Sequence, residues 1–281
     1  MCRKIMALVT VAALILASAC AAAVSETGLF GVLSGEEGAD ERLDALEKNA
    51  EQISVSVATD QYVIEVSQAY YEGNRIYISY RASGTLPGMQ DGIDLEDGSY
   101  ADIIFGDEIV QEDGSVIGWK ECIVPDGKDT DSQTFNFVFG PSEENRIRFT
   151  LDRNDFEQYL QGVSSAETCQ ARAEIARGKV DLKGTVRLIS PEQAASWIAW
   201  QEGEEETGTD VIVCWNLYRN GEPVSIDLFG ASRVNGTDEV VFDVMFPYLE
   251  DISGLLLVPE YGQGGENFEE AIPLEPVIQE Q

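Results

Sequence analysis

The sequence predicts an all-β protein of antiparallel sheets. Apolar and polar residues alternate along many short segments, turn signals such as Gly-Asn and Asn-Gly separate these segments, and helical periodicity is confined to short stretches. Strands at this density with little helix indicate sandwich packing, and we expect two immunoglobulin-like β-sandwich domains. We divide the chain into a signal peptide or membrane anchor (1–20), a stalk with a short helix (21–52), domain 1 (53–165) and domain 2 (166–281).

The N-terminus has the layout of a secretory signal. Residues 1–4 are a short basic head, residues 5–16 are apolar, and small residues follow up to Cys20. The end of this run resembles a bacterial lipobox, in which Cys20 becomes the lipidated first residue. Ordinary cleavage nearby is one alternative, and an uncleaved anchor over 5–24, about long enough to cross a bilayer, is another. We therefore expect an extracytoplasmic chain that is attached to the membrane by a lipid or by this anchor.

A change of composition marks residues 21–52, which are rich in Ala, Gly, Ser and acidic residues. Residues 40–51 can form a short helix with Leu43, Leu46 and Ala50 on one side. We interpret the segment as a stalk that separates the first domain from the membrane.

The first domain opens with a hairpin over residues 60–83, whose two strands alternate on either side of the Gly73-Asn74 turn. Asp113-Gly114 predicts a second hairpin. Residues 152–162 are predicted as a short helix or turn. In the last two strands every second side chain is apolar, and we expect these residues in the core: Phe135, Phe137, Phe139, Ile147, Phe149 and Leu151.

The second domain repeats this pattern. Residues 173–190 predict one long strand or a broken pair, and Pro191 stands at a tolerated first position of a helix. Asn220-Gly221 supplies the positive φ angles that a tight hairpin turn needs. Residues 271–277 predict an edge strand marked by prolines.

Composition excludes several functions. The formal net charge is −33, from 51 acidic and 18 basic residues, and such a surface repels nucleic acid, so no nucleic-acid partner is predicted. The chain has no histidine, which removes the usual general base, the usual zinc ligand and the histidine-containing triads. The motifs of serine hydrolases, P-loop proteins and dinucleotide sites are absent. We predict that the protein is not an enzyme.

Two oxygen-rich loops are the candidate metal sites, because Ca²⁺ prefers carboxylate oxygens. Neither loop has the ligand spacing of an EF-hand, and solvated loops are the simpler interpretation. No other cofactor is predicted. The candidate ligands are Asp91, Asp94 and Asp97 in the first loop and Asp126, Asp129 and Asp131 in the second.

Three cysteines follow Cys20. An odd number outside the cytoplasm allows one disulfide and one remaining thiol, and the pairing among Cys122, Cys169 and Cys214 is open. Cys214, in the middle of a strand, also fits a small buried hydrophobe.

Residues 52–80, and above all residues 63–80 (VIEVSQAYYEGNRIYISY), resemble an extracytoplasmic domain of unknown function in Gram-positive bacteria. Residues 29–31, 255–261 and 269–274 are also similar to it. The domain occurs in membrane proteins often encoded beside extracytoplasmic-function sigma factors, some described as anti-sigma or sigma-regulatory. The resemblance implies tandem immunoglobulin-like sandwiches and no catalytic residues. Such proteins usually carry a cytoplasmic segment before the membrane helix; here residues 1–4 precede the apolar run, so we do not expect direct binding of a sigma factor.

From these observations we predict a non-enzymatic, membrane-tethered module at the bacterial cell envelope, acting as a sensor or ligand-binding protein. Its partner would be an extracellular protein or ligand that the sequence does not identify, and the resemblance implies a link to sigma-factor signalling. Two alternatives come from other classes. One is an envelope hydrolase that uses paired carboxylates, although among 51 acidic residues close pairs also arise by chance. The other is a Ca²⁺-dependent structural or adhesive surface protein.

Overall fold

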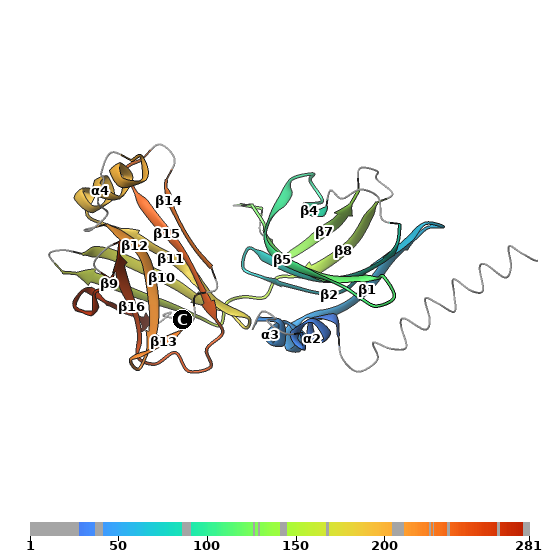
Figure 1. Ribbon diagram of the computed structural model, residues 1–281, viewed down its shortest axis with the longest axis horizontal. Helices are drawn as coiled ribbons and strands as arrows, with labels where there is room; N and C mark the ends of the chain where they lie inside the picture. Colours follow the sequence, from blue (N-terminus) through green and yellow to red (C-terminus); the bar gives the residue numbers. More distant parts are fainter. Residues whose placement is uncertain are drawn as a thin grey trace, which may run out of the picture. The chain divides into compact units, whose positions relative to one another are not determined.

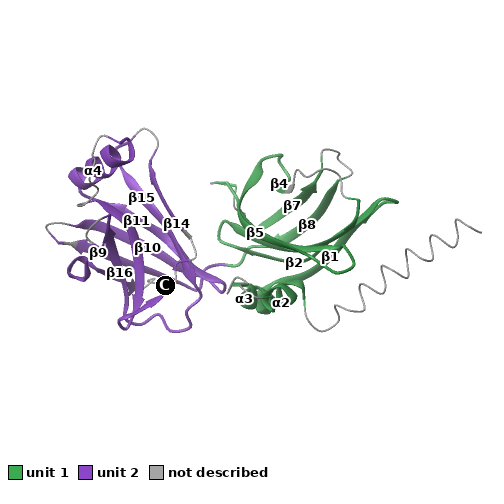
Figure 2. Cartoon of the chain, viewed as in Figure 1, with its two compact units in different colours: residues 1–154 green, residues 155–281 purple. Residues whose placement is uncertain are grey.

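The chain falls into two compact units, residues 1–154 and 155–281, in a computed structural model (Figures 1 and 2). Both units consist mainly of antiparallel sheets, so the predicted fold class is confirmed. The structure describes residues 28–36, 42–85, 91–125, 127–128, 130–140, 145–166, 169–203, 211–224, 226, 228–234, 237–262 and 265–277.

Unit 1 is built on one sheet that folds over on itself. Its strand order is β1-β2-β3-β6-β5-β4-β7-β8, and β4 joins β5 at the pairs Ile93–Ala101 and Asp94–Tyr100. The fold-over brings β1 and β2 against β8 and encloses one apolar core. The strands are β1 (Glu51–Ala58), β2 (Tyr62–Glu72), β3 (Arg75–Gly84), β4 (Asp91–Leu95), β5 (Tyr100–Val110), β6 (Val116–Ile123), β7 (Ser132–Phe139) and β8 (Arg146–Asp152).

The predicted hairpins of unit 1 are confirmed. β2 and β3 pair through the Gly73 turn, where φ is 58°, and β5 pairs with β6 through a turn in which Gly114 has a φ of 80°. The apolar residues expected in β7 and β8 are all buried. Alternation therefore identified the inner face of this sandwich.

Two helices cover the outer face of the same sheet. α2 (Leu29–Ser34) and α3 (Arg42–Asn49) pack on each other, and α2 lies on β2, β3 and β6 (Figure 1). The predicted helix within residues 40–51 is thus confirmed. Large side chains on this outer face are almost completely buried: Tyr70, Tyr77 and Trp119.

The predicted stalk is wrong for the described part of residues 21–52, which belongs to unit 1. Gln68 of β2 is fully buried and accepts a hydrogen bond from the Phe30 N–H at 3.0 Å. Glu47 of α3 accepts from the Gly28 N–H at 2.7 Å and from the Gln68 side chain at 3.0 Å. Composition indicated a spacer, but apolar residues of both helices are needed to cover the aromatic outer face.

Unit 2 is a sandwich of two sheets with its core between them. One sheet has the order β14-β15-β11-β10-β9-β19; the other has the order β13-β12-β16-β17, with β18 also on β16. α4 (Pro191–Gln201) lies at one end of the sandwich (Figure 1). The strands are β9 (Gln158–Ser165), β10 (Gln170–Arg177), β11 (Asp181–Leu188), β12 (Ile212–Arg219), β13 (Glu222–Val224), β14 (Leu228–Arg233), β15 (Val240–Pro247), β16 (Leu255–Tyr261), β17 (Gly265–Glu266), β18 (Ile272–Pro273) and β19 (Glu275–Pro276).

The boundary between the units lies between Asn154 and Asp155, earlier than the expected division at 165/166. The reason is β9, which pairs with β10 along its whole length and so begins unit 2. The helix or turn expected over 152–162 is therefore wrong from Gln158 onward. Phe156 and Leu160 have helical spacing, but Leu160 is buried as an inward strand residue while Tyr159 on the opposite face is exposed.

Other expectations for unit 2 are confirmed or refined. Residues 173–190 form the broken pair β10–β11, and Asn220 and Gly221 have φ angles of 53° and 85°. The expected edge strand over 271–277 is two short pieces instead. β18 pairs with β16 in one sheet and β19 pairs with β9 in the other, because the chain crosses between the sheets at its prolines.

Candidate functional site

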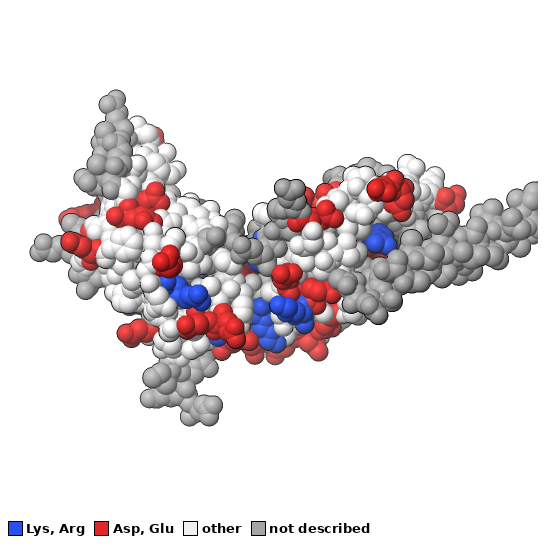
Figure 3. All heavy atoms as spheres, turned by 60° about the horizontal axis from the view of Figure 1, so that its bottom comes forward, with Lys and Arg blue, Asp and Glu red and all other residues white. Residues whose placement is uncertain are grey.

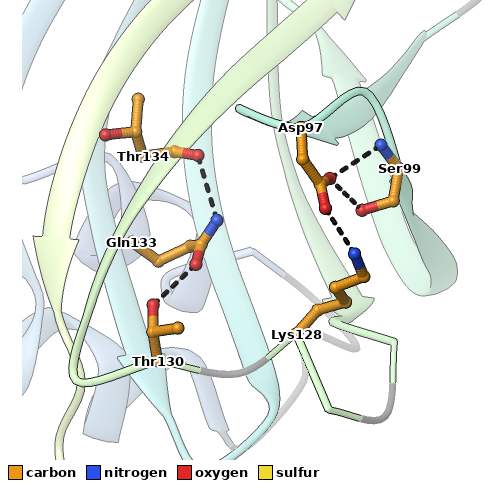
Figure 4. A network of polar contacts seen from close by, with 6 residues as sticks. All are labelled: Asp97, Ser99, Lys128, Thr130, Gln133 and Thr134. Carbon is orange, nitrogen blue, oxygen red and sulfur yellow. Dashed lines mark hydrogen bonds and ion pairs between the residues drawn. The ribbon is translucent and has the colours of Figure 1, made fainter.

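The two acidic loops predicted as metal sites lie side by side in unit 1 (Figure 4). Lys128 of the second loop donates to Asp97 of the first, with 2.5 Å between Nζ and Oδ2. Asp97 also accepts from the Ser99 hydroxyl at 2.5 Å and from the Ser99 N–H at 3.0 Å. The Lys128 ammonium, with these Ser99 donors, holds the pKa of Asp97 well below its usual range. A lysine thus occupies the position that a cation would take at Asp97.

The other described candidate ligands also face basic side chains. Asp94 lies 3.4 Å from Arg146, and Asp131 lies 2.8 Å from Arg153. The side chains of Asp91, Asp126 and Asp129 lie outside the described part of the chain. Among the described residues no group of three or more Asp, Glu, Cys or His side chains is arranged to hold a metal ion. Ca²⁺ binding stays a prediction.

A pair of facing carboxylates lies on the outer face of the second sheet of unit 2. Glu260 of β16 is directly opposite Glu266 of β17, and the Asn216 side chain donates to both, at 3.0 and 2.9 Å. A hydrolase with two carboxylates needs its substrate between them. At this pair the position is taken by the Asn216 amide.

Tyr218 gives this pair a pH-dependent reporter. Its hydroxyl donates to Glu266 at 2.7 Å, and this bond to the carboxylate raises the pKa of Tyr218 from 10.0 to about 12. Because the folded state binds this proton more tightly, the resulting stability is complete below pH 10 and is lost as the pH rises through 12. The tyrosinate absorbance of the Tyr218→Phe variant, subtracted from that of wild type at each pH, should show the titration of Tyr218 near pH 12. Glu266→Gln should return the pKa of Tyr218 toward 10. A difference titration already centred near 10 in wild type contradicts the assignment.

Cys169 and Cys214 carry free thiols, so no disulfide joins these two cysteines. Cys122 is buried in the core of unit 1 and Cys169 in the core of unit 2. Burial raises the pKa of the Cys169 thiol to about 11, and burial together with Glu260 raises that of Cys214. High pKa values disfavour the thiolate, so Cys169 and Cys214 are poor nucleophiles.

Cys20 lies outside the described residues, as does the predicted signal or anchor segment. In the part of the chain that is described, no helix has the length and hydropathy needed to cross a membrane.

A hollow of about 610 Å³ lies on the outer face of the six-stranded sheet of unit 2. Side chains alternate across β10 and β11, so Arg172, Glu174 and Arg187 point away from the core. The first turn of α4 forms an apolar wall, and its start is fixed by the Ser190 hydroxyl, which accepts from the Gln193 N–H at 3.4 Å. The lining residues are Arg172, Glu174, Thr185, Arg187, Leu188, Ile189, Ser190, Pro191, Ala194, Asp238 and Glu239.

Two arginines lie next to each other in this hollow. Arg172 and Arg187 are direct cross-strand partners, an arrangement that is destabilising for like charges. Arg187 is paired with Glu239 at 2.6 Å. The described residues provide no hydrogen bond or ion pair to Arg172. Its guanidinium is therefore available to an anionic group from outside.

Sequence reasoning missed this surface, although a signal was present. Seven basic residues lie in 155–281, and five of them fall within 170–188 beside only Glu174 and Asp181, in a chain of net charge −33. On the face shown in Figure 3 acidic side chains are spread over both units and basic ones gather in a few small groups. Local charge, rather than total charge, was the informative quantity. The five are Arg172, Arg177, Lys179, Lys183 and Arg187.

No family model matches the chain, and neither does any curated protein. Among solved structures, the chain is similar to the conserved domain protein from Bacillus anthracis, with 14% sequence identity and a TM-score of 0.54, over 90% of this chain and 94% of that one. This likeness concerns the fold. A comparison with the N-terminal eight Ig domains of Down Syndrome Cell Adhesion Molecule isoform 1.30.30 gives 10% identity and a TM-score of 0.22, over 79% and 37% of the two chains. That score is too low to support an argument.

Proposed function

We propose that the chain is a non-enzymatic binding module on the outside of the bacterial cell envelope, and that the hollow in unit 2 holds an anionic group of its ligand. The observation that carries the proposal is the Arg172–Arg187 pair, in which one guanidinium has no acidic partner among the described residues. A guanidinium binds a carboxylate through two parallel hydrogen bonds.

The surroundings of the arginines limit the ligand further. Glu174, Asp238 and Glu239 also line the hollow, so a polyanion such as nucleic acid would be repelled. Ile189, with 47% of its surface exposed, and the neighbouring Pro191 and Ala194 offer an apolar wall. These features fit a ligand with a single carboxylate beside an apolar body.

The location belongs to the same proposal and rests on the predicted signal and on the resemblance to the sigma-factor-associated domain. Intact-mass analysis of membrane and soluble fractions tests it, with Cys20→Ser as the variant. We expect a lipid-modified mature chain that starts at Cys20, and the loss of that modification in Cys20→Ser. A chain that retains residues 1–4 in the cytoplasmic fraction contradicts the location.

The ligand class can be tested with a matched pair of small probes. We expect 4-phenylbutyrate to shift the backbone amide resonances of β10, β11 and the start of α4, and 4-phenylbutylamine, which has the same apolar body, to leave them unchanged. Physiological salt screens the general repulsion of anions by the chain. Arg172→Gln should weaken binding about tenfold or more, because hydrogen bonds to charged groups contribute about 1.5–3 kcal/mol.

Arg148→Gln, which removes an exposed arginine of unit 1, is the matched control and should leave the affinity unchanged. Equal shifts with the amine, or an unchanged affinity in Arg172→Gln, would contradict an anion-binding hollow.

A further inference from the structure

The strand β5 of unit 1 has one edge that, over most of its length, no other strand of the described residues covers. β6 pairs with β5 on one side from Asp102 to Val110. On the other side, among the described residues, β4 pairs only with Tyr100 and Ala101. In an antiparallel strand alternate residues turn their N–H and C=O groups to each side. About half of the backbone groups in Asp102–Val110 are therefore presented to an open edge.

β4 leaves this edge because it turns toward the other layer. Asp91 and Gly92 are still part of β4, yet they pair with Phe139 and Val138 of β7 and not with β5. The sheet thus opens where it folds over, and β5 is left as the rim.

The rim is unusually apolar. Eleven large apolar side chains are exposed among the described residues, and four of them lie on this one strand: Tyr100, Ile103, Phe105 and Val110. β1, the edge strand at the end of the same sheet, differs, because its apolar residues Ile53, Val55 and Val57 pack against the core. Edge strands are usually protected against pairing by charge or by being covered. The apolar side chains of β5 remain accessible to a partner.

The charges on β5 indicate which partner fits. No lysine or arginine occurs between residues 91 and 119, whereas Asp102 and Asp107 are exposed on the strand. Glu108 adds a third carboxylate, with Lys120 of β6 at 3.7 Å. A second copy of β5 would place these acids against each other, and like charges on paired strands are destabilising.

We propose that the open edge of β5 binds an extended segment of a partner protein in which basic residues alternate with apolar ones. The segment adds an antiparallel strand beside β5: its backbone completes the open ladder, its apolar side chains cover Ile103 and Val110, and its lysines or arginines meet the strand's acids. Strand addition of this kind obtains affinity from main-chain hydrogen bonds and specificity from alternate side chains. This interaction is separate from the hollow in unit 2, and Arg172→Gln should not alter it.

The test uses the full chain and an alternating peptide, acetyl-VKVKVKVKV-amide, as the probe. We expect the peptide to slow hydrogen exchange of the open-edge amides within Asp102–Val110 by about tenfold or more at saturation. The same peptide with every second backbone nitrogen methylated keeps its charge and apolar content but loses those donors, and it should give no protection. Equal protection by the two peptides, or protection confined to other strands, overturns the proposal.

Protein variants provide a second measurement. Ile103→Lys with Val110→Lys places positive charges on the edge and should weaken peptide binding about tenfold or more. Val63→Lys is the matched control, since Val63 has 39% of its surface exposed against 41% for Ile103 but lies on β2, which is paired on both sides. Val63→Lys should bind as wild type does. Protection of β5 that grows with protein concentration in the absence of peptide would assign the edge to a second copy and overturn the proposal.

Discussion

Glu121→Gln should destabilise unit 1 by about 3–5 kcal/mol, the range found when one partner of a buried ion pair is removed. Glu121 is fully buried on β6 and accepts from two arginines, each at 2.5 Å. One is Arg42 of α3, whose side chain is 1% exposed, and the other is Arg75 of β3. Glutamine preserves the shape of the side chain but removes the negative charge that both arginines contact.

The loss of stability should extend to α2 and α3, the helices that cover the outer face of the sheet. The Arg42 guanidinium also lies 5.0 Å from the ring centre of Phe105 and 5.3 Å from that of Trp119, so it joins α3 to β5 and β6. Trp119 is the single tryptophan of unit 1, so the unfolding of this unit is followed as the part of the urea fluorescence change that differs between the variant and wild type, the three tryptophans of unit 2 being common to both. We expect a lower transition midpoint and, before the main transition, earlier exposure of α3 to proteolysis.

Glu96→Gln is the matched control, because Glu96 pairs with Arg148 and both side chains are 63% exposed. Exposed pairs contribute about 0–1 kcal/mol. If the two variants lose the same small amount of stability, the buried cluster does not hold the helices on the sheet.

Phe242→Ala should destabilise unit 2 by about 3–5 kcal/mol, as expected for truncation of a buried aromatic side chain. Phe242 of β15 is fully buried, and its ring lies 6.2 Å from Trp197, 6.3 Å from Trp215 and 5.8 Å from Phe229, measured between ring centres. The cavity would loosen the contact between the two sheets at Trp215 and the packing of α4 on the sheet at Trp197.

Urea unfolding followed by circular dichroism measures this loss, and the near-ultraviolet signal of the tryptophans should fall with it. Phe268→Ala removes the same number of atoms from a ring that is 51% exposed and serves as the control. A loss in Phe242→Ala no greater than in Phe268→Ala would show that Phe242 is not central to the core.

The inner faces of both sandwiches could be predicted from the sequence, because alternation along one strand is a local property. Phe135 and Phe137 of β7 needed no knowledge of their neighbours to be placed in the core. The outer face of unit 1 could not be assigned in this way. Tyr70 and Tyr77 lie on the face opposite to the core, and only the pairing of β3 with β6, which adds Trp119 to that face, shows that a cover was required.

The candidate sites depended still more on tertiary structure. The acids of the two loops were visible in the sequence, whereas the basic partners Arg146 and Arg153 come from β8 and the residue after it. Likewise, Arg172 and Arg187 are distant in sequence and become neighbours only through the register of β10 with β11. Residue type and spacing gave candidate ligands, and register determined which of them have partners.

The contact of Gly28 with Glu47 shortens the reach of the protein from its proposed lipid attachment. If residues 21–52 were all spacer, an extended chain of 32 residues could hold unit 1 up to about 110 Å from Cys20. Because unit 1 is already engaged at Gly28, only residues 21–27 intervene, and their full extension is about 25 Å. If Cys20 carries the proposed lipid, this short connection would hold a chain of charge −33 close to an anionic lipid surface that repels it. Under the proposed attachment, a partner of unit 1 would therefore bind near the membrane surface.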